Sequence, residues 1–444
     1  MTSGTLPYIP LDVLQCRIAA SKVLIERPEA NAGRTGRERE MKDIIIVGGG
    51  YVGLSVAVAV KTAAPHLDIE LMEAAPEHVW QKDERASAII AAAINMLKTL
   101  ELWDDIKDDA QPINDMVVTD SKTGEPVKPV FLTFADRAAT NEPFAYMIPN
   151  VSMVRALRQK ADELGIAIRH GAAVTAFENN GGHARITLAG GEEIATRLVV
   201  ACDGVRSRLR DMAGIKTVKF DYGQSGIVTT VSHERPHNGR AEEHFLPAGP
   251  FAILPLKGNR SSLVWTERTD DAKRLVESDD MVFEVELERR FGHHLGKLSL
   301  AGGRRAFPLG LTLSRAFIAP RLALAGDAAH GIHPISGQGL NLGFKDVAAL
   351  AETIVEADRM GLDIGAMDTL ERYQRWRRFD TVRMGMTTDV LNRLFSNDIG
   401  PLRVARDFGL GVVDRMPGLK RYFIEEAAGR TMHDKPKLLA GEPL

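Results

Sequence analysis

Three glycines, Gly48, Gly50 and Gly53, follow an apolar run at residues 43–47. A continuous apolar run is typical of a strand that is buried on both faces of a parallel sheet. With this spacing the first glycine permits a tight turn, the second lets the backbone approach a pyrophosphate, and the third lets helix and strand pack closely. The free N–H groups at the start of the following helix favour phosphate. The pattern therefore predicts a dinucleotide site.

An acidic residue strengthens this prediction. Residues 68–72 form a second strand pattern, and Glu73 follows it, twenty residues after Gly53. A carboxylate at this strand end accepts hydrogen bonds from an adenosine ribose and disfavours a 2′-phosphate. The glycines alone are a weak signal, but strand, turn, helix, strand and acid in register favour a bound ligand over a plain glycine turn. Because the sequence contains one such fingerprint, we expect one resident dinucleotide.

Two more predicted strands run into turns with polar residues. Residues 197–202 lead into Asp203 and Gly204, where the aspartate could simply cap the next helix. Residues 321–325 lead into Gly326 and Asp327, and an aspartate there could accept hydrogen bonds from a polyhydroxylated chain. Glycines then precede a predicted helix at 342–354, and N–H groups at a helix start can stabilise a ring carbonyl or developing negative charge.

Together, the three segments resemble the class A flavoprotein aromatic hydroxylases, which have the para-hydroxybenzoate hydroxylase fold. The stretches 333–350 and 241–256 are most similar to the hydroxylases of ubiquinone biosynthesis, and the resemblance spans about residues 41–429. It implies FAD as resident cofactor, NADPH or NADH as a transient reductant and O2 as co-substrate. The implied reaction is hydroxylation of a phenol, either a simple aromatic or a polyprenylated precursor of ubiquinone.

The resemblance also implies roles for individual residues. The glycine fingerprint and Glu73 would hold the adenosine half of FAD, Asp327 the ribityl chain, and the backbone of 337–341 the flavin ring, with Asp203 behind the cofactor. Arg85 and Arg155 match polar cofactor contacts, although both could be surface charges. The implied cofactor-binding residues are Gly48, Gly50, Gly53, Glu73, Arg85, Arg155, Asp203, Asp327, Gly337, Gly339, Leu340 and Asn341.

A phenol becomes a better nucleophile when it loses its proton, so a base would help the reaction. Tyr222, His330 and His333 are the candidates, although a packed, structural histidine is an equally good interpretation of either imidazole. Pro334 would border the substrate face of the flavin ring. No Cys/His cluster has zinc-ligand spacing, so we predict no metal site.

The elements that would position these residues indicate an α/β fold: a Rossmann-like FAD-binding domain interleaved with a mostly antiparallel β substrate domain, plus C-terminal helices. Alternating strand patterns in 214–308 predict the second sheet. The residues Phe245, Phe251, Leu254 and Trp265 could line an apolar slot there or form plain core. The predicted parts are a disordered leader or mis-assigned start (1–40), the FAD-binding domain (41–115, 150–213 and 309–358), the substrate domain (116–149 and 214–308) and a C-terminal helical region (359–444).

Composition narrows the function further. The 444 residues hold 56 basic and 59 acidic side chains, a balance that argues against a nucleic-acid binder. Two cysteines cannot form a disulfide framework, and no apolar run reaches the roughly 18 residues of a membrane span. We therefore expect a cytoplasmic protein, with peripheral contact to the inner face of the membrane, or to a biosynthetic complex, through its C-terminal arginines. A solvated helix face is the alternative. Those arginines are Arg372, Arg375, Arg377, Arg378 and Arg383.

Three other functions fit the same fold. The chain could hydroxylate a soluble aromatic acid of the salicylate or hydroxybenzoate type, or reduce an isoprenoid chain. It could also be a non-catalytic FAD-bearing scaffold in a quinone-biosynthesis assembly. Oligomeric state and the choice between NADH and NADPH have no signature in the sequence.

Overall fold

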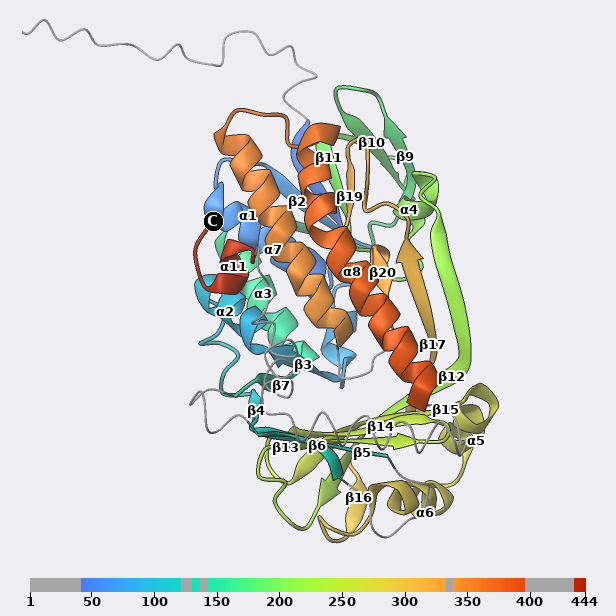
Figure 1. Ribbon diagram of the computed structural model, residues 1–444. Helices are drawn as coiled ribbons and strands as arrows, with labels where there is room; N and C mark the ends of the chain where they lie inside the picture. The colour runs from blue at the N-terminus through green and yellow to red at the C-terminus, as the bar shows by residue number, and fades with distance from the viewer. Residues whose placement is uncertain (1–40, 121–129, 136–142, 333–337, 396–434) are drawn as a thin grey trace, which may run out of the picture. The chain divides into compact units, whose positions relative to one another are not determined.

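The computed structural model describes residues 41–120, 130–135, 143–332, 338–395 and 435–444. The predicted leader, residues 1–40, lies outside the described residues. Residues 41–444 form one compact unit. Two sheets dominate this unit, one mainly parallel and one mainly antiparallel, together with the helices that cover them (Figure 1).

The parallel sheet has the strand order β18-β19-β11-β1-β2-β8, with β10 and β9 continuing from β11 as an antiparallel extension. Strand β1 lies at its centre, between β11 and β2, and is parallel to both. The strands are β1 (Lys42–Val47), β2 (Ile69–Glu73), β8 (Ala167–His170), β9 (Val174–Asn179), β10 (Ala184–Leu188), β11 (Glu193–Ala201), β18 (Ile318–Ala319) and β19 (Leu322–Leu324).

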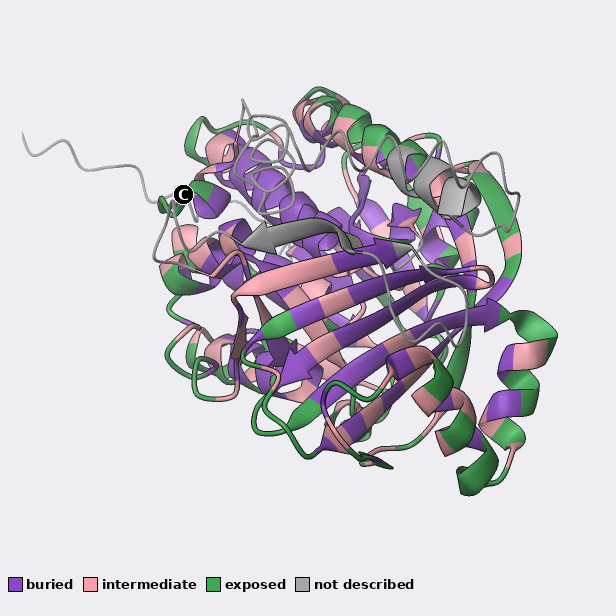
Figure 2. Cartoon of the chain, turned by 60° about the horizontal axis from the view of Figure 1, so that its bottom comes forward, coloured by how far each residue is buried: buried purple, intermediate pink, exposed green. Residues whose placement is uncertain are grey.

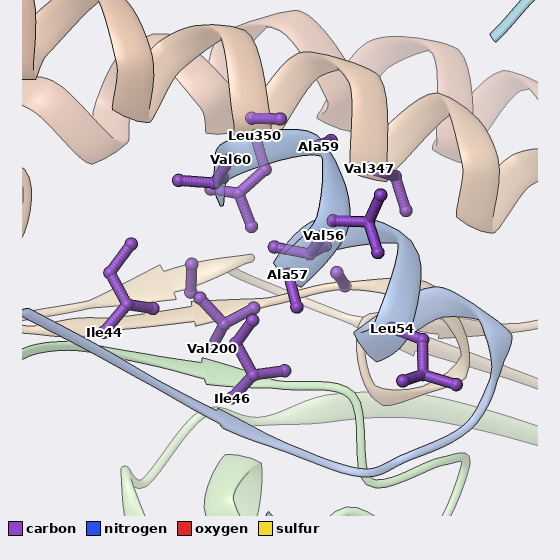
Figure 3. Packing of buried hydrophobic residues seen from close by; sticks show 14 of the residues in the cluster. Ile44, Ile46, Leu54, Val56, Ala57, Ala59, Val60, Val200, Val347 and Leu350 are labelled. Atoms are coloured by element: carbon purple, nitrogen blue, oxygen red, sulfur yellow. The ribbon is translucent and has the colours of Figure 1, made fainter. Parts of the chain in front are cut away.

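Helices pack on this sheet because both of its faces are apolar. The helices concerned are α1 (Tyr51–Ala63), α2 (Ala91–Thr99), α3 (Asn150–Glu163), α4 (Arg208–Met212), α7 (Gln338–Arg359), α8 (Met367–Phe395) and α11 (Lys437–Ala440). Ile44, Ile46 and Val200 of the sheet meet α1, and α1 meets Val347 and Leu350 of α7 (Figure 3). All five side chains are fully buried, and each contributes about 1.5–3 kcal/mol on burial.

The antiparallel sheet has the strand order β20-β17-β12-β15-β14-β13-β5-β6, with β16 paired to β12. Its strands are β5 (Asp115–Asp120), β6 (Val130–Ala135), β12 (Thr217–His233), β13 (Arg240–Leu246), β14 (Gly249–Leu256), β15 (Arg260–Arg268), β16 (Leu298–Leu300), β17 (Arg305–Ser314) and β20 (His330–Gly331). Its strands are mostly buried or intermediate in Figure 2. One face packs on α5 (Thr269–Glu277) and α6 (Asp280–Phe291), around the aromatic side chains of Phe251, Trp265 and Phe283.

The predicted fold class is therefore confirmed. Along the chain, groups of strands belong alternately to the parallel and the antiparallel sheet, so the two domains are interleaved. A third, small sheet joins β3 (Ala86–Ile90), β7 (Ala145–Pro149) and β4 (Gln111–Ile113). Two details differ from the predicted divisions: β7 belongs to this small sheet, and β17 crosses the boundary predicted between 308 and 309. No helix in the described part of the chain is long and apolar enough to cross a membrane.

Candidate active site

A cavity of about 580 Å³ lies between the carboxyl ends of the parallel strands and the antiparallel sheet. The ends of β1, β2, β11 and β19 meet at one edge, which is where ligands bind in open α/β sheets. Residues from all four strand ends reach the cavity, and β13, β14 and β15 supply its opposite wall. The lining includes Gly50, Tyr51, Glu73, Trp80, Arg85, Arg158, Cys202, Asp327, Gly339, Leu340, Glu243, Ala252, Leu254 and Val264.

The three fingerprint glycines are required for different reasons. Gly48 has a φ of +112°, and a Cβ there would lie 2.3 Å from the backbone oxygen of Cys202. A Cβ on Gly53 would lie 2.0 Å from the oxygen of Gly48, so these two glycines build the turn itself. Gly50 has ordinary angles (φ −77°, ψ 179°), and a Cβ there would meet no protein atom within 4 Å. The space in front of Gly50 therefore fits a ligand such as the pyrophosphate of FAD.

Glu73 is held in place at the end of β2. One carboxylate oxygen accepts a 2.7 Å hydrogen bond from the N–H of Gly49, and the other accepts one of 2.7 Å from Ala75. Each oxygen has a second lone pair, and the residue lines the cavity, so the carboxylate can also accept ribose hydroxyls. Its location fits the adenosine end of FAD.

Arg85 lines the same cavity as one half of a bidentate ion pair. Its Nε and Nη2 donate to the two oxygens of Asp83 at 2.7 and 2.8 Å, and Asn150 donates to Asp83 at 3.1 Å. Burial alone would raise the pKa of Asp83, but the hydrogen bonds and charge of Arg85 and the amide of Asn150 hold it below its usual value. The guanidinium is therefore fixed in direction, and its charge is balanced within the protein.

Arg155 does not lie among the residues that line the cavity. It is exposed on α3, where its Nη2 donates to Asp109 at 2.9 Å. Arg158, three residues further along the helix, lines the cavity instead. Its guanidinium lies 5.4 Å from the ring centroid of Trp80 and 2.8 Å from Nε2 of His170. Sequence reasoning missed Arg158, which lies at the cavity where Arg155 was expected.

Asp327 lies in the short η3 helix (Gly326–Ala328), directly after β19. It faces the open cavity, so water reaches it, although protein surrounds the cavity on most sides. This partial desolvation raises the pKa of Asp327, against the opposing charges of His330 and Arg85. Asp203, by contrast, does not line the cavity: one oxygen accepts the N–H groups of Arg208 and Leu209 at 2.9 and 3.3 Å. It lies behind Cys202 and Gly204, which do.

His330 is fully buried and does not line the cavity. Its Nε2 lies 2.5 Å from an oxygen of Asp346, which also accepts the N–H of Gly326 at 2.9 Å. The other oxygen of Asp346 accepts Nε of Arg377 at 2.8 Å, and Arg377 in turn bonds Asp380 at 3.1 Å. These contacts favour the structural interpretation of His330: it belongs to a buried ionic network beneath the turn that holds Asp327, out of reach of a substrate.

The other candidate bases are not placed in the cavity either. Tyr222 donates a 2.9 Å hydrogen bond to Asp389 of α8 and is not a lining residue. His333, Pro334 and Gly337 lie outside the described residues.

The residues predicted at the start of α7 are partly in position. Gly339 and Leu340 line the cavity. The side chain of Asn341 instead links α7 to β3, through hydrogen bonds of 3.0 Å to the N–H of Ile90 and 2.8 Å to the oxygen of Ala88. That link fixes the helix start against the small sheet.

The structure separates the residues that could have lined an apolar slot or formed plain core. Leu254 lines the cavity, whereas Phe251 and Trp265 point to the opposite face of the antiparallel sheet, into the core with α5 and α6. Sequence reasoning also missed Glu243, an acidic residue of β13 that is only 2% exposed and lines the cavity. The one available signal was the two-residue period of β13, which puts Glu243 on one face and Glu242 on the other.

Comparison with known proteins agrees with this geometry. Residues 41–378 match the family model described as "FAD binding domain". The chain is 44% identical to ubiquinone hydroxylase UbiL of Rhodospirillum rubrum, over 94% of this chain and 97% of that protein. It is 34% identical to 3-demethoxyubiquinol 3-hydroxylase of Escherichia coli K12, over 87% of this chain and 98% of that protein.

A solved structure agrees in fold. The p-nitrophenol 4-monooxygenase PnpA of Pseudomonas putida superposes with a TM-score of 0.73 over 88% of this chain and 99% of that one, at 18% identity. The match supports the two-sheet architecture. The family model and the extensive likeness to two ubiquinone-pathway hydroxylases show that the chain belongs to the FAD-binding monooxygenase family.

Proposed function

We propose that this chain is an FAD-dependent, NAD(P)H-using monooxygenase that hydroxylates the ring of a polyprenyl phenol in ubiquinone biosynthesis. One observation carries the proposal. A single cavity extends from a dinucleotide-binding turn at Gly50 to a largely apolar wall on the antiparallel sheet. That geometry can hold a flavin and an aromatic ring in contact. The relatives named for ubiquinone hydroxylation support the choice of substrate class.

FAD, when bound, supplies the redox chemistry that joins NAD(P)H oxidation to activation of O2. The chain's own residues bind and orient it. The turn at Gly50 and the α1 N-terminus would take the pyrophosphate, Glu73 the ribose, and Asp327 the ribityl hydroxyls. Arg85 and Arg158 would flank the cofactor. Backbone N–H groups at Gly339 and Leu340 would stabilise negative charge on the flavin ring.

The antiparallel sheet would form the substrate side. Ala252, Leu254 and Val264 make one wall of the cavity apolar, and a substrate bound against that wall would displace water and so protect reactive oxygen chemistry from side reactions. A non-catalytic scaffold would have no need of an apolar wall facing the cofactor. Reduction of an isoprenoid chain would place an alkene there rather than a phenol, and the assay below separates the two.

The test is oxidation of NADH and NADPH by the FAD-loaded protein under air, with and without a short-chain 2-polyprenylphenol. We expect the phenol to stimulate oxidation several-fold and to gain one oxygen atom, measured by mass spectrometry with 18O2. A yellow protein with no phenol-stimulated oxidation would favour the scaffold. Saturation of the side chain without oxygen incorporation would favour the reductase.

We also propose that α8 docks on an anionic membrane surface, because a polyprenylated substrate resides in lipid. Phe379, Val382 and Met386 follow helical spacing and are 78%, 37% and 62% exposed. Arg375 and Arg378 are exposed beside them, whereas Arg377 is fully buried. Exposed apolar side chains flanked by basic ones are typical of interfacial helices. This docking would place the protein at the inner face of the membrane.

Replacing Phe379 with serine should weaken binding to phosphatidylglycerol-containing vesicles by roughly tenfold, because a buried aromatic side chain contributes about 1.5–3 kcal/mol. Flotation at low and high salt measures the effect. Met281 of α6 is 77% exposed, and Met281→Ser is the matched control that should change nothing. Equal flotation of both variants, or binding that salt does not affect, would contradict the docking surface.

A further inference from the structure

The side chain of Tyr51 lines the cavity, and none of the roles described above uses it. Tyr51 follows Gly50 directly and is the first residue of α1. Its ring packs against the apolar core, and the residue is half-buried. Its hydroxyl forms no hydrogen bond with any residue that the structure describes. Because enclosed polar groups normally have a partner, this hydroxyl is available to a ligand in the cavity.

Neighbouring charges show which end of the cavity the phenol of Tyr51 faces. Burial raises the pKa of Tyr51, and the charge of Arg85 opposes this rise. The negative charges of Asp327 and Asp83 add to it. Glu73, at the adenosine end, is not among these neighbours. The phenol therefore lies toward the flavin end of the cavity and keeps its proton at neutral pH.

Asp327 complements this phenol chemically. It lines the same cavity directly after β19, and within the described part of the chain its carboxylate accepts no hydrogen bond. An ionised carboxylate only accepts hydrogen bonds, whereas the protonated phenol of Tyr51 can donate one. A hydroxyl group satisfies both, because it donates to one partner and accepts from the other. A phosphate oxygen only accepts, and the charge of Asp327 would repel it.

We propose that Tyr51 is a cofactor-binding residue whose hydroxyl donates a hydrogen bond to the ribityl chain of FAD, beside Asp327. A ribityl chain that is held by two side chains fixes the direction of the flavin ring relative to the apolar wall. The inference rests on the FAD binding that the proposed function includes, and not on the choice of substrate.

The test is the affinity of the full-length chain for FAD and for ADP, which contains the adenosine and diphosphate but no ribityl chain. Flavin fluorescence during titration measures the first, and competition with FAD measures the second. Tyr51→Phe removes only the hydroxyl, so urea unfolding of the apoprotein should not change. We expect this variant to bind FAD roughly five- to tenfold more weakly, the range for one lost hydrogen bond. Its affinity for ADP should stay within about twofold of the wild type.

Two further variants control for the nature and the place of the change. Tyr222→Phe makes the same substitution at a tyrosine that does not line the cavity, and it should leave the affinity for FAD unchanged. Glu73→Gln should weaken FAD and ADP together, because Glu73 lies at the adenosine end.

Unchanged affinity of Tyr51→Phe for FAD would overturn the inference. Equal weakening of FAD and ADP would overturn it as well, because the hydroxyl would then contact the pyrophosphate. An equal loss of FAD affinity in Tyr222→Phe would mean that the effect is not local to the cavity. Because affinity is measured without turnover, the expected pattern in a protein that forms no hydroxylated product would count against the proposed reaction alone.

Discussion

Replacing Gly50 with valine should yield a folded protein that does not retain FAD. The backbone of Gly50 has angles that any residue adopts, and no protein atom lies within 4 Å of the position of a Cβ. The apoprotein should therefore keep most of its stability, losing only the modest preference of a helix N-cap for glycine over valine. The added side chain would occupy the space where the pyrophosphate approaches the α1 N-terminus. We expect a loss of affinity of at least a hundredfold, equivalent to about 2.8 kcal/mol.

The measurement is the ratio of flavin to protein after exhaustive dialysis, together with urea unfolding of the apoprotein. Gly53→Ala is the informative contrast. Alanine adds a smaller side chain than valine, but at this position its Cβ would lie 2.0 Å from the oxygen of Gly48 and force the turn apart. We expect that variant to lose about 3 kcal/mol of stability from overpacking. A Gly50→Val protein that keeps a full complement of FAD would mean that the cofactor lies elsewhere.

The contrast between these glycines also shows what a sequence can predict. The fingerprint is local: strand, turn, helix and acid lie within residues 43–73, so their spacing alone defines the geometry. The Gly326–Asp327 turn is equally local, since it ends a short buried strand. Both segments lie at the cavity as expected, together with Glu73.

Other residues depend on which side of an element meets the cavity, and spacing does not determine that. Both faces of the antiparallel sheet are covered, one by α5 and α6 and the other by the cavity, so apolar residues occur on each. Alternation therefore predicted two faces but could not tell that Trp265 belongs to the core and Val264 to the cavity. The same limit applies to α3, where a shift of three residues separates exposed Arg155 from Arg158 in the lining.

The burial of charged side chains is another feature that the sequence could not predict. His330 follows Asp327 closely in sequence, which made it a candidate base. Its partner, however, is Asp346 of α7, and the other oxygen of Asp346 is bonded by Arg377 of α8. Only the tertiary structure reveals that the imidazole of His330 is bonded to Asp346 within a buried ion-pair network. The arginines of α8 looked alike in sequence for the same reason, and the structure separates buried Arg377 from exposed Arg375.

Replacing Arg377 with methionine should lower the free energy of unfolding by about 3–5 kcal/mol. Arg377, Asp346 and His330 are all fully buried. Removal of Arg377 leaves the Asp346 carboxylate with one fewer cation, and an uncompensated buried charge is costly. Urea unfolding at pH 7 measures the loss. Arg375→Met, an exposed change two residues away, should stay within about 0.5 kcal/mol of the wild type.

The pH dependence of this loss identifies its cause. Despite burial, which would raise them, the charges of His330, Arg377 and Lys345 lower the pKa values of Asp346 and Asp380, the latter to about 2. A carboxyl whose folded-state pKa is depressed stabilises the fold above its unfolded pKa of about 4, and that contribution disappears as the pH falls through the folded value. The difference between wild type and Arg377→Met should therefore be largest near neutrality and shrink below about pH 4. A difference that is constant with pH would mean that Arg377 stabilises the protein through packing of its side chain and not through its charge.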